Sequence, residues 1–145
     1  MLSALLVVAT LAGFYGHPDL LQLDQDIAAL KKERATLRTF ADMPKRDVVD
    51  RQIEQLERVR ARAFAVIDAR IQRCLQTAPL TTPVVGTQPA HAGAVCLSAA
   101  DGVVGTVRRI EELRALAREK RTWTDRNERD ALEREAKELE DALLR

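Results

Sequence analysis

Apolar residues recur at alternating spacings of three and four on both sides of an uncharged, proline-rich segment, and this pattern constrains the fold more than any other feature. Residues spaced in this way share one face of an α-helix, and over several turns they form the seam of a coiled coil. Between the two blocks, residues 74–100 carry no charge and include Pro79, Pro83 and Pro89, which exclude a continuous helix there. The sequence therefore predicts an all-α protein in which coiled-coil-like long helices form a hairpin around this connector.

The first block predicts a heptad helix over residues 19–43. Asp19 with Gln22 resembles an N-cap followed by a capping-box partner, and Pro44 ends the helix because it lacks a backbone N–H. The apolar seam of this helix consists of Leu20, Leu23, Ile27, Leu30 and Leu37. Because the break at Pro44 separates this seam from the following helix, we expect the seam to bind a protein partner or a second copy of the chain.

A longer amphipathic helix is predicted over residues 44–76, and its wide apolar stripe suits packing against more than one neighbour. The C-terminal block, residues 98–145, is predicted to be helical. Ser98 to Asp101 resembles the capping box that starts it. Its seam, formed by Leu132, Leu139 and Leu143, is a second candidate contact with a partner.

A kink is expected near residues 122–125, because Asp125 to Glu128 resembles a second capping-box start inside the C-terminal block. Trp123, the sole tryptophan, lies at this point. A lone aromatic residue at a helix junction is commonly a packing anchor, and docking of a partner is the alternative role.

The two cysteines flank the connector, residues 77–97. A disulfide between Cys74 and Cys96 would close a loop of about 20 residues, fix the flanking helices, and contribute roughly 3 kcal/mol in the chain-entropy account. The alternative is two unpaired thiols in a reducing compartment. We favour the disulfide, which implies an oxidising compartment such as the periplasm.

Residues 1–18 are apolar and carry no charged side chain. As a helix they would measure about 27 Å, close to the ~30 Å of a bilayer core. A membrane anchor, a cleaved signal peptide and a helix buried in a protein complex are the three interpretations. A signal peptide requires a basic residue before its apolar run, and no Lys or Arg precedes the run here. We favour a retained signal-anchor, which gives a single-pass membrane protein with the bulk of its chain in the periplasm or another oxidising compartment.

Composition argues against several classes of function. The formal net charge is +1, so there is no overall attraction to nucleic acid. Two cysteines and two histidines are too few for a dedicated metal centre. Paired carboxylates such as Glu111 and Glu112 lie on charged helix faces with no pocket-forming residues nearby. We therefore predict a non-enzymatic protein without catalytic residues, cofactor, metal or small-molecule substrate.

The order of these segments resembles that of phage inner-membrane spanins: a short apolar N-terminus, a coiled-coil stalk, a cysteine-bearing Ala/Thr/Pro-rich segment and a charged terminal helix. Spanins of this class are held in the inner membrane and, with an outer-membrane lipoprotein partner, span the periplasm during host lysis. The resemblance implies a membrane-tethered structural or adaptor protein of the cell envelope that acts in phage lysis. The alternative is an accessory structural subunit of a larger membrane complex or virion, with the apolar N-terminus packed against other subunits.

Overall fold

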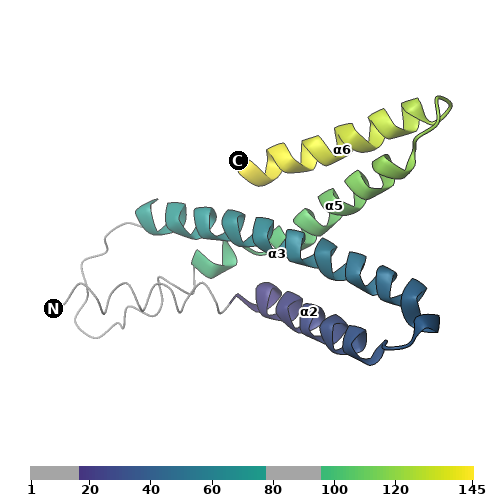
Figure 1. Cartoon of the computed structure of the whole chain (residues 1–145). Helices are drawn as coiled ribbons and strands as arrows, with labels where there is room; N and C mark the ends of the chain where they lie inside the picture. Colours follow the sequence, from purple (N-terminus) through teal and green to yellow (C-terminus); the bar gives the residue numbers. More distant parts are fainter. Residues whose placement is uncertain (1–16, 78–95) are drawn as a thin grey trace.

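The computed structural model describes residues 17–77 and 96–145, and 86% of these residues are helical, with none in a strand. This confirms the predicted all-α class. The elements in chain order are α2 (Pro18–Thr36), the 3-10 helix η1 (Phe40–Asp42), α3 (Met43–Thr77), α5 (Val103–Glu119) and α6 (Arg126–Leu144). They form two antiparallel hairpins, α2 with α3 and α5 with α6 (Figure 1). The predicted anchor, except for its last two residues, and residues 78–95 of the connector lie outside the described residues.

Helix α2 begins and ends earlier than its pattern predicts. Its N-cap is His17, whose Nδ1 accepts a hydrogen bond from the backbone N–H of Asp19 at 3.3 Å, so the assignment of Asp19 as N-cap is wrong. Pro18 occupies the first turn, where the missing N–H costs nothing. The helix ends at Thr36, and Leu37 caps it by donating to the carbonyl of Arg34. The chain therefore reverses before Pro44 is reached.

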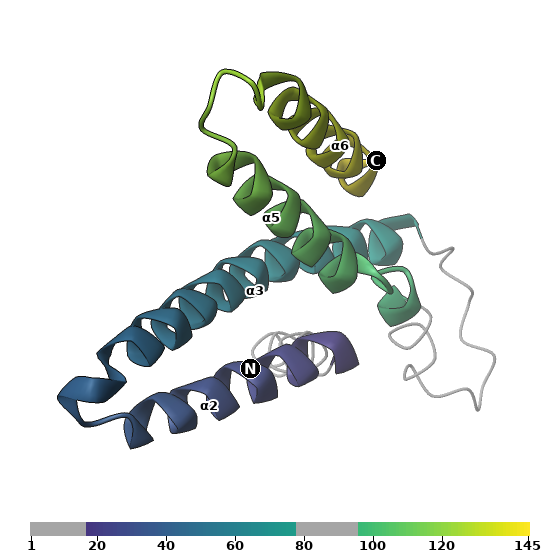
Figure 2. The same ribbon diagram turned by 90° about the vertical axis from the view of Figure 1, so that its right-hand side faces the viewer.

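Helix α3 runs from Met43 to Thr77, against an expected 44–76, and is the longest element described. It lies between α2 on one side and the α5/α6 pair on the other (Figures 1 and 2). Its buried positions are Val49, Ile53, Val59, Ala63, Ile67 and Ile71. The wide apolar stripe read from the sequence thus serves two neighbours, one on each flank.

Two apolar clusters hold the described chain together. The larger lies where α2, α3 and the start of α5 meet, and the end of α6 also reaches it. Its buried members include Leu23, Val59, Ile67, Val103, Val107 and Leu143. The smaller cluster lies between α5 and α6 and consists of Ile110, Leu113 and Ala136, with Leu132 and Leu139 packed against it. Most of the buried aliphatic volume therefore lies at the junction of the two hairpins.

Helix α5 starts later than the capping-box pattern at Ser98 predicts. Residues 96–98 form a short helical turn, and the chain then turns through residues 99–102. Gly102 has a φ of 78°, a left-handed conformation that is unstrained for glycine, and it precedes Val103 as the N-cap of α5. This left-handed residue redirects the chain, so α5 begins at Val103 rather than at Ser98.

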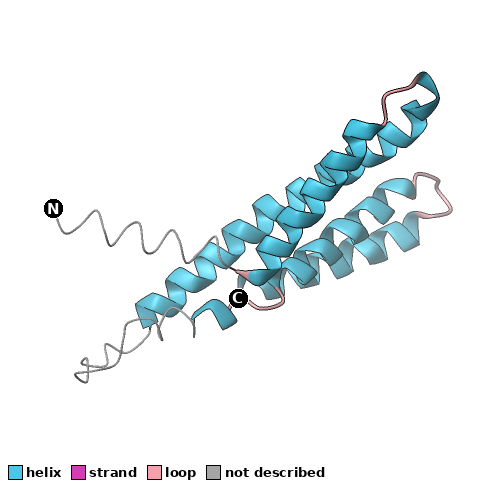
Figure 3. Ribbon diagram, turned by 90° about the horizontal axis from the view of Figure 1, so that it is seen from below, coloured by secondary structure: helices cyan, strands magenta, loops and turns pink. Residues whose placement is uncertain are grey.

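The chain reverses fully between α5 and α6, where the sequence predicts a kink. Residues 120–125 connect the two helices, and α6 runs back alongside α5 (Figure 3). Trp123 lies in this loop with 81% of its surface exposed, so its interpretation as a packing anchor is wrong. Its ring contacts the guanidinium of Arg126, which lies 5.4 Å from the ring centroid.

Candidate interaction surfaces

Cys74 and Cys96 form a disulfide, as the sequence predicts, with their Cα atoms 5.6 Å apart. The bond joins the last turns of α3 to the helical turn that precedes α5. Cys96 is buried in the larger cluster and Cys74 packs at its edge. The disulfide is therefore part of the junction core and fastens the second hairpin to the first.

A network of ion pairs also connects the helices at this junction. The guanidinium of Arg62 on α3 contacts Glu111 of α5 at 3.2 Å and also Glu140 of α6. Arg114 of α5 contacts the other carboxylate oxygen of Glu140 at 2.6 Å. Glu111 is buried, so removal of its partner would leave a charge with little access to water. These four side chains tie three helices together at one point.

Exposed ion pairs join α2 to α3 along the first hairpin. Lys31 lies 2.7 Å from Glu57, Arg34 lies 2.9 Å from Asp50, and Asp24 pairs with Arg60. The hydrogen bond from Arg34 to Asp50, with the negative charge of that carboxylate, raises the pKa of the guanidinium. Pairs this exposed contribute at most about 1 kcal/mol each. They fix the register of the two helices more than they stabilise them.

The predicted seam of the first helix faces its own chain over much of its length. Leu20, Leu23 and Ile27 are buried in the larger cluster against α3 and α5. The expectation that this helix finds no partner within its chain is therefore corrected, because the short 37–42 reversal brings α2 back onto α3. Leu30 and Leu37 are half-buried and retain exposed surface.

The C-terminal seam also contains both buried and half-buried leucines. Leu143 is buried in the larger cluster, and its carbonyl accepts a hydrogen bond from Arg70 of α3 at 2.9 Å. Leu132 and Leu139 are half-buried against the smaller cluster. Binding of another chain through these seams stays a prediction. The seam residues with solvent-exposed surface are the half-buried leucines, Leu30, Leu37, Leu132 and Leu139.

A shallow hollow lies between α2, α3 and α5, and Leu30 lines it. Its walls come from α2, α3 and α5, namely Asp26, Ala29, Leu30, Gln52, Gln55, Leu56, Arg108 and Glu112. Arg108 and Asp26 lie 3.5 Å apart across its edge. The hollow therefore offers two leucine side chains framed by polar groups, which is a pattern suited to a protein contact.

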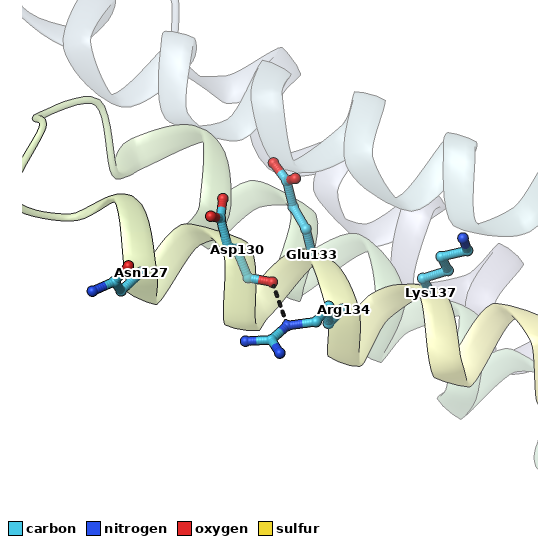
Figure 4. Close-up of a pocket in the computed structure, with 5 residues that line it drawn as sticks. All are labelled: Asn127, Asp130, Glu133, Arg134 and Lys137. Atoms are coloured by element: carbon cyan, nitrogen blue, oxygen red, sulfur yellow. Dashed lines mark hydrogen bonds between the residues drawn. The ribbon is translucent and has the colours of Figure 1, made fainter.

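Two other hollows lie on and beside α6. One is lined by Asn127, Asp130, Glu133, Arg134 and Lys137, all of which project from the same helix (Figure 4). Arg134 donates from Nε to the carbonyl oxygen of Asp130 at 3.3 Å. The other is lined by charged side chains of α5 and α6. Acidic and basic groups alternate in both hollows, so neither concentrates one kind of chemistry. Within residues 17–77 and 96–145, no cluster of three or more His, Cys, Asp or Glu could hold a metal ion.

His17 is a residue whose structural role the sequence pattern missed. Its side chain is 1% exposed, and its Nε2 lies 3.5 Å from Oδ1 of Asp101 without a hydrogen bond among the described residues. The residue thus caps α2 on one side and faces the turn before α5 on the other. A histidine next to Pro18 is a weak N-cap signal, so the sequence pattern does not indicate this role.

The fold and these surfaces define a class: an all-helical scaffold of two hairpins, joined at one junction by a disulfide and a charge network. No helix in the described part of the chain is long and apolar enough to cross a membrane. Comparisons with known protein families, with curated proteins and with solved structures find no match to this chain.

Proposed function

We propose that this protein is a non-enzymatic structural adaptor of the cell envelope, tethered to a membrane by residues 1–18. The observation that carries the proposal is the construction of the junction. A disulfide and a four-residue charge network hold the α5/α6 hairpin against α3. The outer faces of the helices stay exposed to solvent. Such a scaffold presents surfaces to partners.

The partner contact is assigned to the half-buried leucines rather than to the whole predicted seam. Leu30 and Leu56 line the hollow between the hairpins and keep exposed surface. Leu20, Leu23 and Ile27 are occupied within the chain and would reach another chain if α2 left α3. The hollow therefore accepts an apolar side chain of a partner helix or of a second copy.

The membrane tether, the apolar N-terminal helix and the envelope location rest on the sequence of residues 1–18, and a disulfide suits an oxidising compartment. A part in phage lysis follows from the spanin-like order of segments alone. Alkaline carbonate extraction of membranes from cells that make the full chain tests the tether. We expect the chain to stay with the lipid, and the double variant Leu6→Arg with Val8→Arg to be released. Release of the wild-type chain would favour the accessory-subunit alternative.

The contact surface has its own test. The variant Leu30→Glu places a charge in the hollow, and we expect it to weaken self-association or partner binding in sedimentation and co-purification, with helix content unchanged. Leu21→Glu, on the same helix and outside the hollow, is the matched control. Equal effects of both variants would contradict the assignment of the hollow.

A further inference from the structure

The two most exposed large apolar side chains among the described residues are aromatic, and each lies at the closed end of a hairpin. Phe40, in the α2/α3 reversal, is 87% exposed, and Trp123, in the α5/α6 loop, is 81% exposed. Both closed ends lie at the same end of the molecule, away from the C-terminal turn of α3 (Figures 1 and 3). Exposed rings are unfavourable in water, so their shared position calls for an explanation.

The same two places each carry a net positive charge. We define the tips as residues 37–46 and 118–126. The first tip carries three basic side chains and one carboxylate, and the second carries four basic side chains and two carboxylates. Together the tips hold a net charge of +4 in a chain whose net charge is +1. The rest of the chain is therefore net negative overall, although residues 58–73 of α3 also carry a net charge of +4.

Two guanidinium groups of the first tip donate to backbone carbonyls, which do not neutralise their charge. Arg46 donates to the backbone carbonyl of Leu37 at 2.7 Å, and Arg38 donates to that of Ala35 at 3.1 Å. The carboxylate of Asp42 accepts hydrogen bonds from the backbone N–H and hydroxyl of Thr39, at 3.1 and 2.6 Å. The basic side chains thus retain their charge while the local carboxylate is bound by the loop itself.

The second tip has similar hydrogen bonds within its loop, but the charge of its Lys120 is compensated by Glu128. Arg121 donates to the carbonyl of Arg118, and Thr122 donates its hydroxyl to Asp125. Lys120 contacts Glu128 of α6, and the guanidinium of Arg126 lies over the ring of Trp123. An aromatic ring flanked by exposed guanidinium groups is the pattern found where proteins meet the membrane interface.

We propose that the two tips together bind an anionic phospholipid surface. A protein partner needs a contiguous patch of about 800 Å² per side, whereas here single rings project from two separate loops. A nucleic acid would favour a larger excess of positive charge. A fluid bilayer accepts two separate loops at any spacing, takes the rings at headgroup depth and attracts the basic groups. The proposal concerns the tips and does not depend on membrane attachment by residues 1–18.

Trp123 provides the measurement, since it is the sole tryptophan of the chain. The full chain is mixed with phosphatidylcholine vesicles, with or without about 30% phosphatidylglycerol, to supply the negative surface potential. We expect a blue shift of Trp123 emission, and quenching by brominated lipid, with the anionic vesicles and not with the neutral ones. High salt should reverse both effects. Because emission reports the tip itself, binding by residues 1–18 does not produce the signal.

Variants sharpen the test. Each basic residue near an anionic surface favours binding by about fivefold. We therefore expect Lys45→Gln with Arg121→Gln to lower the partition of the tips onto the anionic surface by about 25-fold, measured as loss of the Trp123 shift at a fixed lipid concentration. Phe40→Ser should also weaken the shift. Lys137→Gln and Leu144→Ser, exposed changes outside the tips, are the matched controls and should leave it unchanged.

Three outcomes would overturn the proposal. The first is unchanged Trp123 emission with anionic vesicles, and the second is an equal shift with neutral and anionic vesicles. The third is a shift produced by a short RNA and not by vesicles, which would assign the tips to nucleic acid. The extraction experiment on residues 1–18 is independent of all three, so failure of one proposal is distinguishable from failure of the other.

Discussion

In the α2/α3 hairpin, α2 buries the large side chains of Leu20, Leu23 and Ile27 in the cluster that α3 and the start of α5 share, whereas in the α5/α6 hairpin α6 has two buried residues. Those two are Ala136, which packs in the small cluster with Ile110 and Leu113, and Leu143, which belongs to the junction. Ion pairs join the helices of both hairpins, and those between α5 and α6 include Arg109–Glu135 at 3.2 Å.

The difference concerns how much buried aliphatic surface α2 and α6 each contribute, since ion pairs are present in both hairpins. A fully buried aliphatic side chain contributes roughly 1.5–3 kcal/mol, and an exposed ion pair contributes about 0–1 kcal/mol. Helices α2 and α3 therefore contribute many large buried side chains to the larger cluster, whereas α6 places Leu143 there and Ala136 in the smaller one, so the second hairpin depends more on Leu143 and the charge network. We expect the α5/α6 hairpin to open first as the protein is destabilised.

The largest expected effect comes from the larger apolar cluster, to which α2 contributes Leu23. Leu23 is 1% exposed, and Leu23→Ala should lower the free energy of unfolding by about 2–5 kcal/mol, because it removes buried methyl groups and leaves a cavity. Urea titration followed by circular dichroism measures the change. Leu21→Ala, at a 46% exposed position of the same helix, should cost less than about 0.5 kcal/mol. If both variants lowered the free energy of unfolding equally, the distinction between the buried and exposed faces of α2 would be wrong.

A smaller effect is expected from the charge network. Arg62→Ala removes the partner of buried Glu111, and we expect a loss of about 1–3 kcal/mol, concentrated in the second hairpin. Hydrogen exchange of α6 amides should accelerate more than that of α2 amides. Arg58→Ala breaks an exposed pair with Glu54 on the same helix and should cost a few tenths of a kcal/mol. Uniform acceleration across both hairpins would show that the network does not attach α5 and α6 selectively.

The smallest effect is a pH dependence at the tip of the first hairpin. Hydrogen bonds from the side chain and backbone of Thr39 lower the pKa of Asp42 below its ordinary value. A folded-state pKa lower than the unfolded one means that this stabilisation is present above the ordinary Asp range and is lost as pH falls through the folded-state pKa. In Thr39→Val, which lacks the hydroxyl donor, NMR titration should show the pKa of Asp42 rising toward its ordinary value. An unchanged titration would exclude the hydroxyl as the cause.

Local signals in the sequence predict the long helix and the covalent link well. Pro44 lies in the first turn of α3, and apolar spacing gives its extent within a residue at each end. Two cysteines flanking an uncharged loop predict the disulfide that the structure contains. Each of these predictions depends on residues near one another in the chain or on a pair with no competing cysteine.

Pairing between helices is harder to predict, because periodicity shows which face is apolar and not which neighbour covers it. The seam at Leu20 and Leu23 reads equally well as a contact with another chain or with α3. Asp125 signals a helix start, and nothing in its pattern distinguishes a kink from a reversal. The burial of His17 and the convergence of Arg62 on two glutamates depend on contacts among distant segments, so no local pattern reports them.

The disulfide also determines how the molecule would carry tension. Residues 74 and 96 are held 5.6 Å apart, whereas the chain between them could extend to roughly 75 Å. A pull between the start of α2 and the end of α6 would pass through the sulfur–sulfur bond and leave the connector slack. Because Leu20 and Leu143 belong to the same cluster, that pull would open both hairpins from the junction toward their tips, turn by turn. Reduction of the bond would add the stored contour length to the extension of the molecule in a single step.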